Sequence, residues 1–131
     1  MYKLCLNSRD ELLVIDLQKI AFFQANGNYT QMNYISGENR LLTLGLTKIE
    51  EVIRISWPKG TPSPFVRLGR SLIVNQNYLS EISVLRQRLV LSDWSGNSHS
   101  LTVPKPLLKN YKEHIYKEYQ AKINKEKNNG E

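Results

Sequence analysis

Short stretches of alternating apolar and polar residues fill much of the chain, and this alternation predicts β-strands. Residues 1–7 and 11–16 are two such stretches, and the turn-forming residues between them predict an opening hairpin. Residues 20–23 and 29–35 predict a second hairpin that turns at Asn26-Gly27-Asn28. The pattern therefore predicts two successive hairpins. One face of the last of these strands carries Thr30, Met32 and Tyr34.

Residues 41–44 predict the next short strand, and a helix is expected after it. Thr47 and Glu50 have the spacing of a capping box, so we expect the helix to begin there. Pro58 and the proline-containing stretch after it keep the helix short. Its apolar stripe, spaced to pack on a sheet, consists of Ile49, Val52 and Ile53.

The second half of the chain returns to strand patterns. Residues 65–75 have the composition of a strand, interrupted at Gly69-Arg70-Ser71. Residues 78–85, 88–91 and 100–103 predict further strands.

Helical spacing reappears near the C-terminus. Pro106 suits the first turn of a helix, and the last residues of the chain are polar and highly charged. We expect residues 1–118 to form the domain and residues 119–131 to be a charged tail into which the helix frays. The stripe of this helix comprises Leu108, Tyr111, Ile115 and Tyr119.

Length and composition suit one domain. With 131 residues and 40% hydrophobic content, the chain can bury a core but is too short for two ordinary domains. Together with the pattern of elements, this predicts a mainly β fold with antiparallel sheets, one short helix between strands and a C-terminal helix.

The charge balance favours a polyanionic partner. The chain has 18 Lys and Arg against 12 Asp and Glu, a formal charge of +6 and a pI of about 9.5, which suits nucleic acid or an anionic membrane surface. No apolar run reaches the length of about 18 residues needed to span a bilayer, and the N-terminus lacks a secretory core. Cys5 is the only cysteine, which excludes an intrachain disulfide. We therefore expect a cytoplasmic protein without membrane association.

The sequence lacks the residue patterns that catalysis or metal binding requires. Ser71 and Cys5 stand in no motif that supplies a base and an oxyanion hole, and His99 and His114 have no partner at metal-ligand spacing. We therefore expect no enzymatic activity, no cofactor and no metal site. Aromatic residues such as Tyr29 could stack on single-stranded bases, but aromatics at alternating strand positions are more often core residues.

Three segments resemble, in order, the signatures of the LytTR DNA-binding domain family. The Gly-Asn-Tyr-Thr and Arg-Ser-x-Ile-Val-Asn strings are together much more specific than either one. The resemblance implies an elongated β fold whose loops enter successive major grooves of double-stranded DNA, in a sequence-specific bacterial transcription regulator. The segments, which span nearly the whole chain, are residues 19–30 (KIAFFQANGNYT), 65–75 (FVRLGRSLIVN) and 103–109 (VPKPLLK).

The resemblance places Thr30 in the family's first recognition loop, with Asn28 in the adjoining turn. Short polar side chains there can contact base edges or phosphates. Alternatively, Asn26-Gly27-Asn28 is only a turn, and Asn28 and Thr30 satisfy local backbone groups. We prefer the turn for Asn26 and Gly27 and DNA contact for Thr30.

Arg70 matches the arginine of the family's second loop, where a guanidinium could fork onto a guanine edge or clamp a phosphate. Before it, Gly69 replaces a histidine that many members carry. Lys105 lies where the family usually has an arginine, so we expect a phosphate contact there. Arg67 and Lys109 could extend the positive surface, although the lysine equally suits the exposed face of the last helix.

Partners other than DNA stay open. Direct-repeat sites are typical of the family, so we expect a monomer in solution that pairs on DNA. The signature region starts close to Met1 and leaves no room for a receiver domain, so a regulatory protein partner is one source of control. A competing hypothesis is a protein-interaction module of LytTR fold that binds a regulator through a strand edge or the C-terminal helix.

Overall fold

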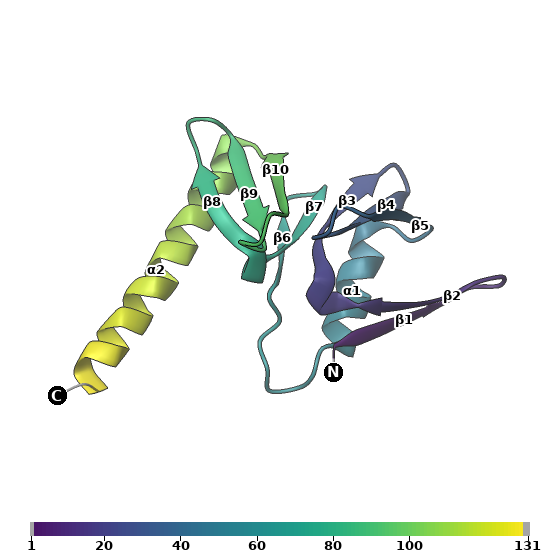
Figure 1. The fold of residues 1–131 in the computed structure, drawn as a ribbon, viewed down its shortest axis with the longest axis horizontal. Helices are drawn as coiled ribbons and strands as arrows, with labels where there is room; N and C mark the ends of the chain where they lie inside the picture. Colours follow the sequence, from purple (N-terminus) through teal and green to yellow (C-terminus); the bar gives the residue numbers. More distant parts are fainter. Residues whose placement is uncertain (1, 130–131) are drawn as a thin grey trace. The chain divides into compact units, whose positions relative to one another are not determined.

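The computed structural model describes residues 2–129 of the chain. Within these residues, ten strands form three sheets. Their arrangement can be followed in Figure 1. The chain is organised in two compact units, Met1–Leu79 with Leu91–His99, and Ser80–Val90 with Ser100–Glu131. The predicted mainly β fold, with one short helix between strands and a C-terminal helix, is confirmed.

In the first unit the strands form a hairpin and a five-stranded antiparallel sheet. The hairpin pairs β1 with β2, and the sheet has the order β5-β4-β3-β7-β6. The two predicted N-terminal hairpins and the turn that interrupts residues 65–75 are confirmed. The elements are β1 (Lys3–Asn7), β2 (Leu12–Asp16), β3 (Ile20–Asn26), β4 (Tyr29–Tyr34), β5 (Asn39–Leu42), β6 (Phe65–Leu68) and β7 (Leu72–Asn75), with the short 3-10 helices η1 (Leu17–Lys19) and η2 (Gln76–Tyr78).

Helix α1 (Leu46–Ser56) contacts β1, β3, β4 and β7. Ile49 and Ile53 are buried and Val52 is half-buried, which confirms the predicted stripe. The helix ends just before Trp57 and Pro58, because proline cannot continue it.

The predicted capping box at the start of α1 is wrong. Gly45 is the N-cap residue, its extended backbone precedes the helix, and no side chain caps the first turn by a hydrogen bond. Thr47 therefore lies inside the helix, where its hydroxyl cannot take the N-cap position.

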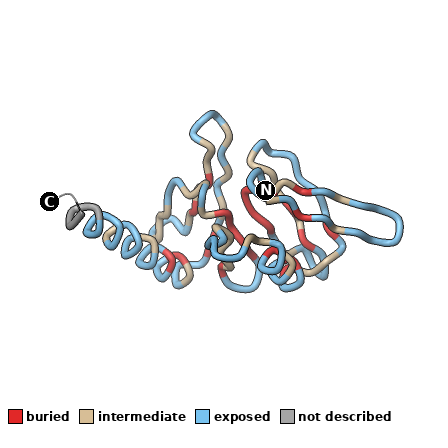
Figure 2. The backbone as a smooth tube through the Cα atoms, turned by 90° about the horizontal axis from the view of Figure 1, so that it is seen from below, coloured by how far each residue is buried: buried red, intermediate tan, exposed pale blue. Residues whose placement is uncertain are grey.

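The core of the first unit is built on the central strands of the five-stranded sheet. Phe23, Met32 and Ile73 come from three neighbouring strands and are fully buried. Figure 2 shows the buried residues, in red, along these strands. Burial of the apolar strand faces is the main stabilising contribution to such a sheet.

A further sheet has the order β10-β9-β8, formed by β8 (Leu79–Ser83), β9 (Arg88–Ser92) and β10 (Ser98–Thr102). Helix α2 (Lys105–Asn129), in the second unit, has Pro106 in its first turn as predicted, and its Leu108 and Tyr111 are buried. Tyr119 lies in the same helix, as its spacing predicts, but its side chain is 62% exposed. The helix continues through residues 119–129, expected as a fraying tail, and the domain boundary at residue 118 stays a prediction.

Candidate nucleic-acid interface

Two turns of the first unit lie at the same end of the five-stranded sheet. The β3–β4 turn follows Asn26, which pairs with Tyr29, and the β6–β7 turn joins Leu68 to its partner Leu72. Strands β3 and β7 are antiparallel neighbours, so the end of β3 adjoins the start of β7. A hydrogen bond of 2.8 Å from the Ala25 amide to the Ser71 carbonyl oxygen ties the second turn to β3.

The β6–β7 turn is held by the side chain that precedes it. Arg67 Nε donates to the Gly69 carbonyl oxygen at 2.8 Å, and a terminal nitrogen donates to the Arg70 carbonyl oxygen at 3.1 Å. Its other terminal nitrogen lies 3.1 Å from a carboxylate oxygen of Glu50, which belongs to α1. The planar guanidinium thus joins the helix to two carbonyls of the turn, which a lysine cannot do.

Gly69 and Arg70 are exposed at the tip of this turn. Gly69 has a φ of +68°, a left-handed conformation that glycine adopts without the steric cost that a Cβ adds. Among the described residues, the Arg70 side chain forms no hydrogen bond or ion pair, while its own carbonyl oxygen is bound by Arg67. The structure therefore presents a free guanidinium on a braced turn.

The two candidate residues at the β3–β4 turn, Asn28 and Thr30, differ in exposure. Asn28 is exposed beside Gly27, whose φ of +62° has the sign that a two-residue hairpin turn with glycine first requires. Thr30 is fully buried, and its hydroxyl donates to the Leu44 carbonyl oxygen at 2.8 Å. This geometry favours the alternative in which Thr30 satisfies a local backbone group instead of contacting DNA.

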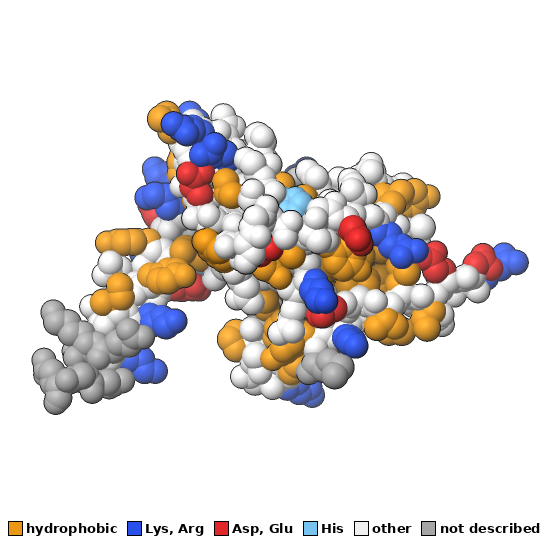
Figure 3. Space-filling model, viewed as in Figure 1, with side chains coloured by type: hydrophobic (Ala, Val, Ile, Leu, Met, Phe, Trp, Pro, Cys, Tyr) orange, Lys and Arg blue, Asp and Glu red, His pale blue; other side chains and the backbone are white. Residues whose placement is uncertain are grey.

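Lys105 and Lys109 belong to the other unit. Both are exposed on the first turns of α2, whose first helical hydrogen bond runs from the Leu108 amide to the Pro104 carbonyl oxygen at 3.1 Å. The structure therefore leaves both ammonium groups accessible to a polyanion. On the face shown in Figure 3, Lys and Arg side chains are scattered over several places, one of them the tip of the β1–β2 hairpin.

Sequence reasoning missed the roles of two residues in the first unit. Glu50 was assigned to a helix cap, whereas its carboxylate pairs with Arg67. Asn75 is buried, and its side chain donates to the Ile20 carbonyl oxygen at 3.0 Å and accepts from the Asn77 amide at 3.0 Å. Both Asn75 and Arg67 fall within the segment of residues 65–75 that resembles the family signature, so that resemblance was the available signal.

The histidine and acidic side chains are possible metal ligands. Among the described residues, no group of three or more His, Cys, Asp or Glu side chains is placed to hold a metal ion. His99 is half-buried, lies 3.2 Å from the Ile35 carbonyl oxygen and contacts the Phe22 ring edge-on, while His114 lies 2.9 Å from Glu118 on α2. No helix in the described part of the chain is both long and apolar enough to cross a membrane.

The sequence profile of the LytTr DNA-binding domain matches residues 10–116, so the chain belongs to the LytTR family. Among solved structures, it is similar to the LytTr DNA-binding domain of a protein described as a methyl-accepting/DNA response regulator from Bacillus cereus. The identity is 20%, the match covers 88% of this chain and 97% of that one, and the TM-score is 0.57. A search of curated proteins gave no match.

Proposed function

We propose that this chain binds double-stranded DNA in a sequence-specific manner and regulates transcription in the cytoplasm of a bacterium. Membership of a family of DNA-binding domains supports DNA binding in general. The formal charge of +6 suits a partner with a phosphate backbone. In this proposal the β6–β7 turn enters a groove, and Arg70 contacts a base edge or a phosphate there.

The observation that carries the proposal is the contrast between Arg67 and Arg70. The Arg67 side chain donates hydrogen bonds to the Gly69 and Arg70 carbonyl oxygens and to Glu50, which fixes the backbone of the turn. The Arg70 guanidinium forms no hydrogen bond with the described residues, so all of its N–H donors are available to DNA. An immobilised backbone lowers the entropic cost of placing a flexible side chain on DNA.

The other candidate residues have supporting roles in this proposal. Asn28, Lys105 and Lys109 are exposed, and we assign them to phosphate contacts that fix orientation. Two copies pair on direct repeats of DNA, with a monomer in solution. Arg67 is bound within the turn and Thr30 is buried, so Arg70 is the first residue to test.

The test is binding of the purified chain to a pool of random duplexes at two salt concentrations, followed by sequencing of the retained DNA. We expect an enriched repeat motif, and Arg70→Ala should weaken binding to it by about 10-fold or more, the value of one good base contact. Arg9→Ala is the matched control, because Arg9 lies in the β1–β2 turn with a 95% exposed side chain. Equal affinity of both variants would refute the proposal.

A protein-interaction module is the second candidate, and one observation favours it. Leu12 and Val14 are 59% and 61% exposed on β2, and Figure 3 shows hydrophobic side chains along this hairpin. Exposed apolar strand residues suit contact with another protein. The same DNA selection decides the matter, since an absence of salt-sensitive DNA binding would favour this second function.

A further inference from the structure

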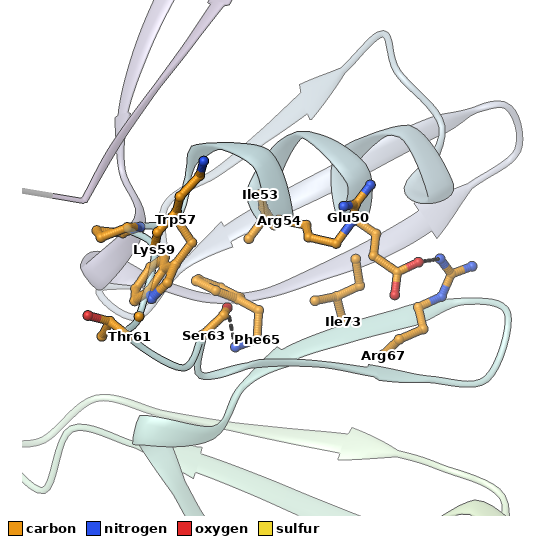
Figure 4. A pocket seen from close by; sticks show the side chains of 12 residues that line it. Glu50, Ile53, Arg54, Trp57, Lys59, Thr61, Ser63, Phe65, Arg67 and Ile73 are labelled. Atoms are coloured by element: carbon orange, nitrogen blue, oxygen red, sulfur yellow. Dashed lines mark hydrogen bonds and ion pairs between the residues drawn. The ribbon is translucent and has the colours of Figure 1, made fainter.

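A pocket of about 400 Å³ lies within the first unit, between α1 and the segment that leads from α1 into β6. Figure 4 shows Trp57 and Phe65 at one end and the Glu50–Arg67 ion pair at the other, with Ile53 and Ile73 between them. A volume of this size falls in the range of small-molecule sites, which are mostly apolar with a few polar groups.

The Trp57 indole N–H is a buried donor without an acceptor. Its nitrogen is shielded from solvent and forms no hydrogen bond within the described residues. The ring itself is held in place, stacked on Tyr2 at 4.4 Å between centroids and edge-on to Phe65 at 6.1 Å. Because an unsatisfied buried donor is costly, an acceptor that reaches it gains a hydrogen bond without any cost of ordering the ring.

The charge around the pocket is positive. Arg54 and Lys59 both line it, and neither forms an ion pair with the described residues. Glu50, the carboxylate of the lining, is already paired with Arg67. The lining also includes the hydroxyl-bearing Thr61 and Ser63. The unpaired cations therefore favour an anionic group next to the apolar side chains of the pocket.

We propose that this pocket binds a small apolar carboxylic acid in its anionic form. The apolar body packs against Ile53, Phe65 and Ile73, and the carboxylate accepts the hydrogen bond from Trp57. Lys59 and Arg54 provide the opposite charge. Residues 59–62 are exposed and outside helices and strands. The proposal includes a shift of this segment by which the acid reaches the indole nitrogen.

Binding is expected to reach the β6–β7 turn, because Arg67 both lines the pocket and holds the Gly69 and Arg70 carbonyl oxygens. An acid in the pocket changes the surroundings of the Glu50–Arg67 pair and so the geometry of the turn. Control of DNA binding by the acid rests on the proposed function, whereas binding of the acid does not. By linkage, DNA would change the affinity for the acid by the same factor.

The experiment follows the tryptophan indole N–H signals of the full chain by NMR, without DNA, as naphthaleneacetate is added. We expect a saturable shift of the Trp57 signal and of the backbone amides of the β6–β7 turn. Trp94, which is 66% exposed and outside the pocket, is the internal control and should not shift. Naphthaleneacetamide, which has the same body without the charge, should bind at least about 10-fold more weakly.

A double variant, Arg54→Gln with Lys59→Gln, tests the charge. Both side chains are exposed, so the fold should persist, and the unchanged signals of distant amides would verify this. The variant is expected to lose about 10-fold in affinity for naphthaleneacetate and little for the amide. The proposal would be overturned if the unaltered chain bound the acid and the amide equally. It would also be overturned if the Trp57 signal did not shift with either compound. Because no DNA is present, either failure leaves the proposed DNA binding untouched.

Discussion

Arg67 and Glu50 lie 17 positions apart in the sequence, yet the guanidinium of one is 3.1 Å from the carboxylate of the other. The pair connects β6 with α1 and holds in place the arginine that braces the β6–β7 turn. The Arg67 side chain is 23% exposed and that of Glu50 48% exposed, so the pair by itself contributes at most about 1 kcal/mol to stability. The pair matters mainly because it fixes the position of the Arg67 guanidinium, which in turn holds the β6–β7 turn.

Arg67→Lys is predicted to weaken DNA binding by about 10-fold, because a lysine keeps the charge but cannot reach the Gly69 carbonyl, the Arg70 carbonyl and Glu50 together. Fluorescence anisotropy with the selected duplex measures the affinity. The slope of affinity against salt should stay at its original value, because the number of neutralised phosphates is unchanged. A variant with full affinity would show that position 67 acts only through its charge.

Thr30→Val is predicted to lower the free energy of unfolding by about 1–3 kcal/mol, because it leaves the partly buried Leu44 carbonyl oxygen without its donor. Thr30→Ser keeps the hydroxyl and is the matched control, with a smaller loss from the missing methyl group. Urea unfolding measures both. If Thr30→Val instead kept its stability and changed the selected DNA sequence, Thr30 would be a base-reading residue.

The sequence predicted most of the fold because its patterns are local. The turn at Asn26-Gly27-Asn28 and the stripe of α1 depend on neighbours a few positions away. The burial of Thr30 was also within reach, since it shares a strand face with the core residue Met32. Helical spacing does not by itself give burial, because Tyr119 lies on the predicted stripe of α2 but beyond its buried part.

The candidate interface was predictable only in part. Arg70 was found through the resemblance, but the bracing role of Arg67 depends on the curvature of a turn and on a helix 17 positions away. No periodic pattern encodes such a contact. The same holds for Asn75 and Ile20, which lie 55 positions apart, and for the pocket beside Trp57, which depends on how α1 and the strands pack.

Asn75→Ala is predicted to destabilise the first unit by about 2 kcal/mol or more. It leaves the buried Ile20 carbonyl oxygen and the Asn77 amide without their side-chain partners. Asn77→Ala keeps Asn75 in place and serves as the control, because the side chain of Asn77 is exposed. Chemical denaturation followed by circular dichroism measures the loss. Equal stability of the two variants would contradict a structural role for Asn75.

Two tyrosines are predicted to make the chain unstable at alkaline pH. Burial first, and then the charge of Glu118, raise the pKa of Tyr111 well above its ordinary value of about 10.0, and burial with Asp93 and Asp16 raises the pKa of Tyr78. Above about pH 10, tyrosines of the unfolded chain lose protons that the folded chain keeps, so the free energy of unfolding falls as pH rises.

Each such tyrosine contributes a slope of up to about 1.4 kcal/mol per pH unit, and stability below about pH 9 should not depend on it. Urea titrations between about pH 9 and about pH 11 measure the slope. Tyr111→Phe removes one ionisable group, so its stability should fall less steeply over this range, whatever its stability at neutral pH. An identical slope in the variant would show that Tyr111 ionises alike in the folded and unfolded chain.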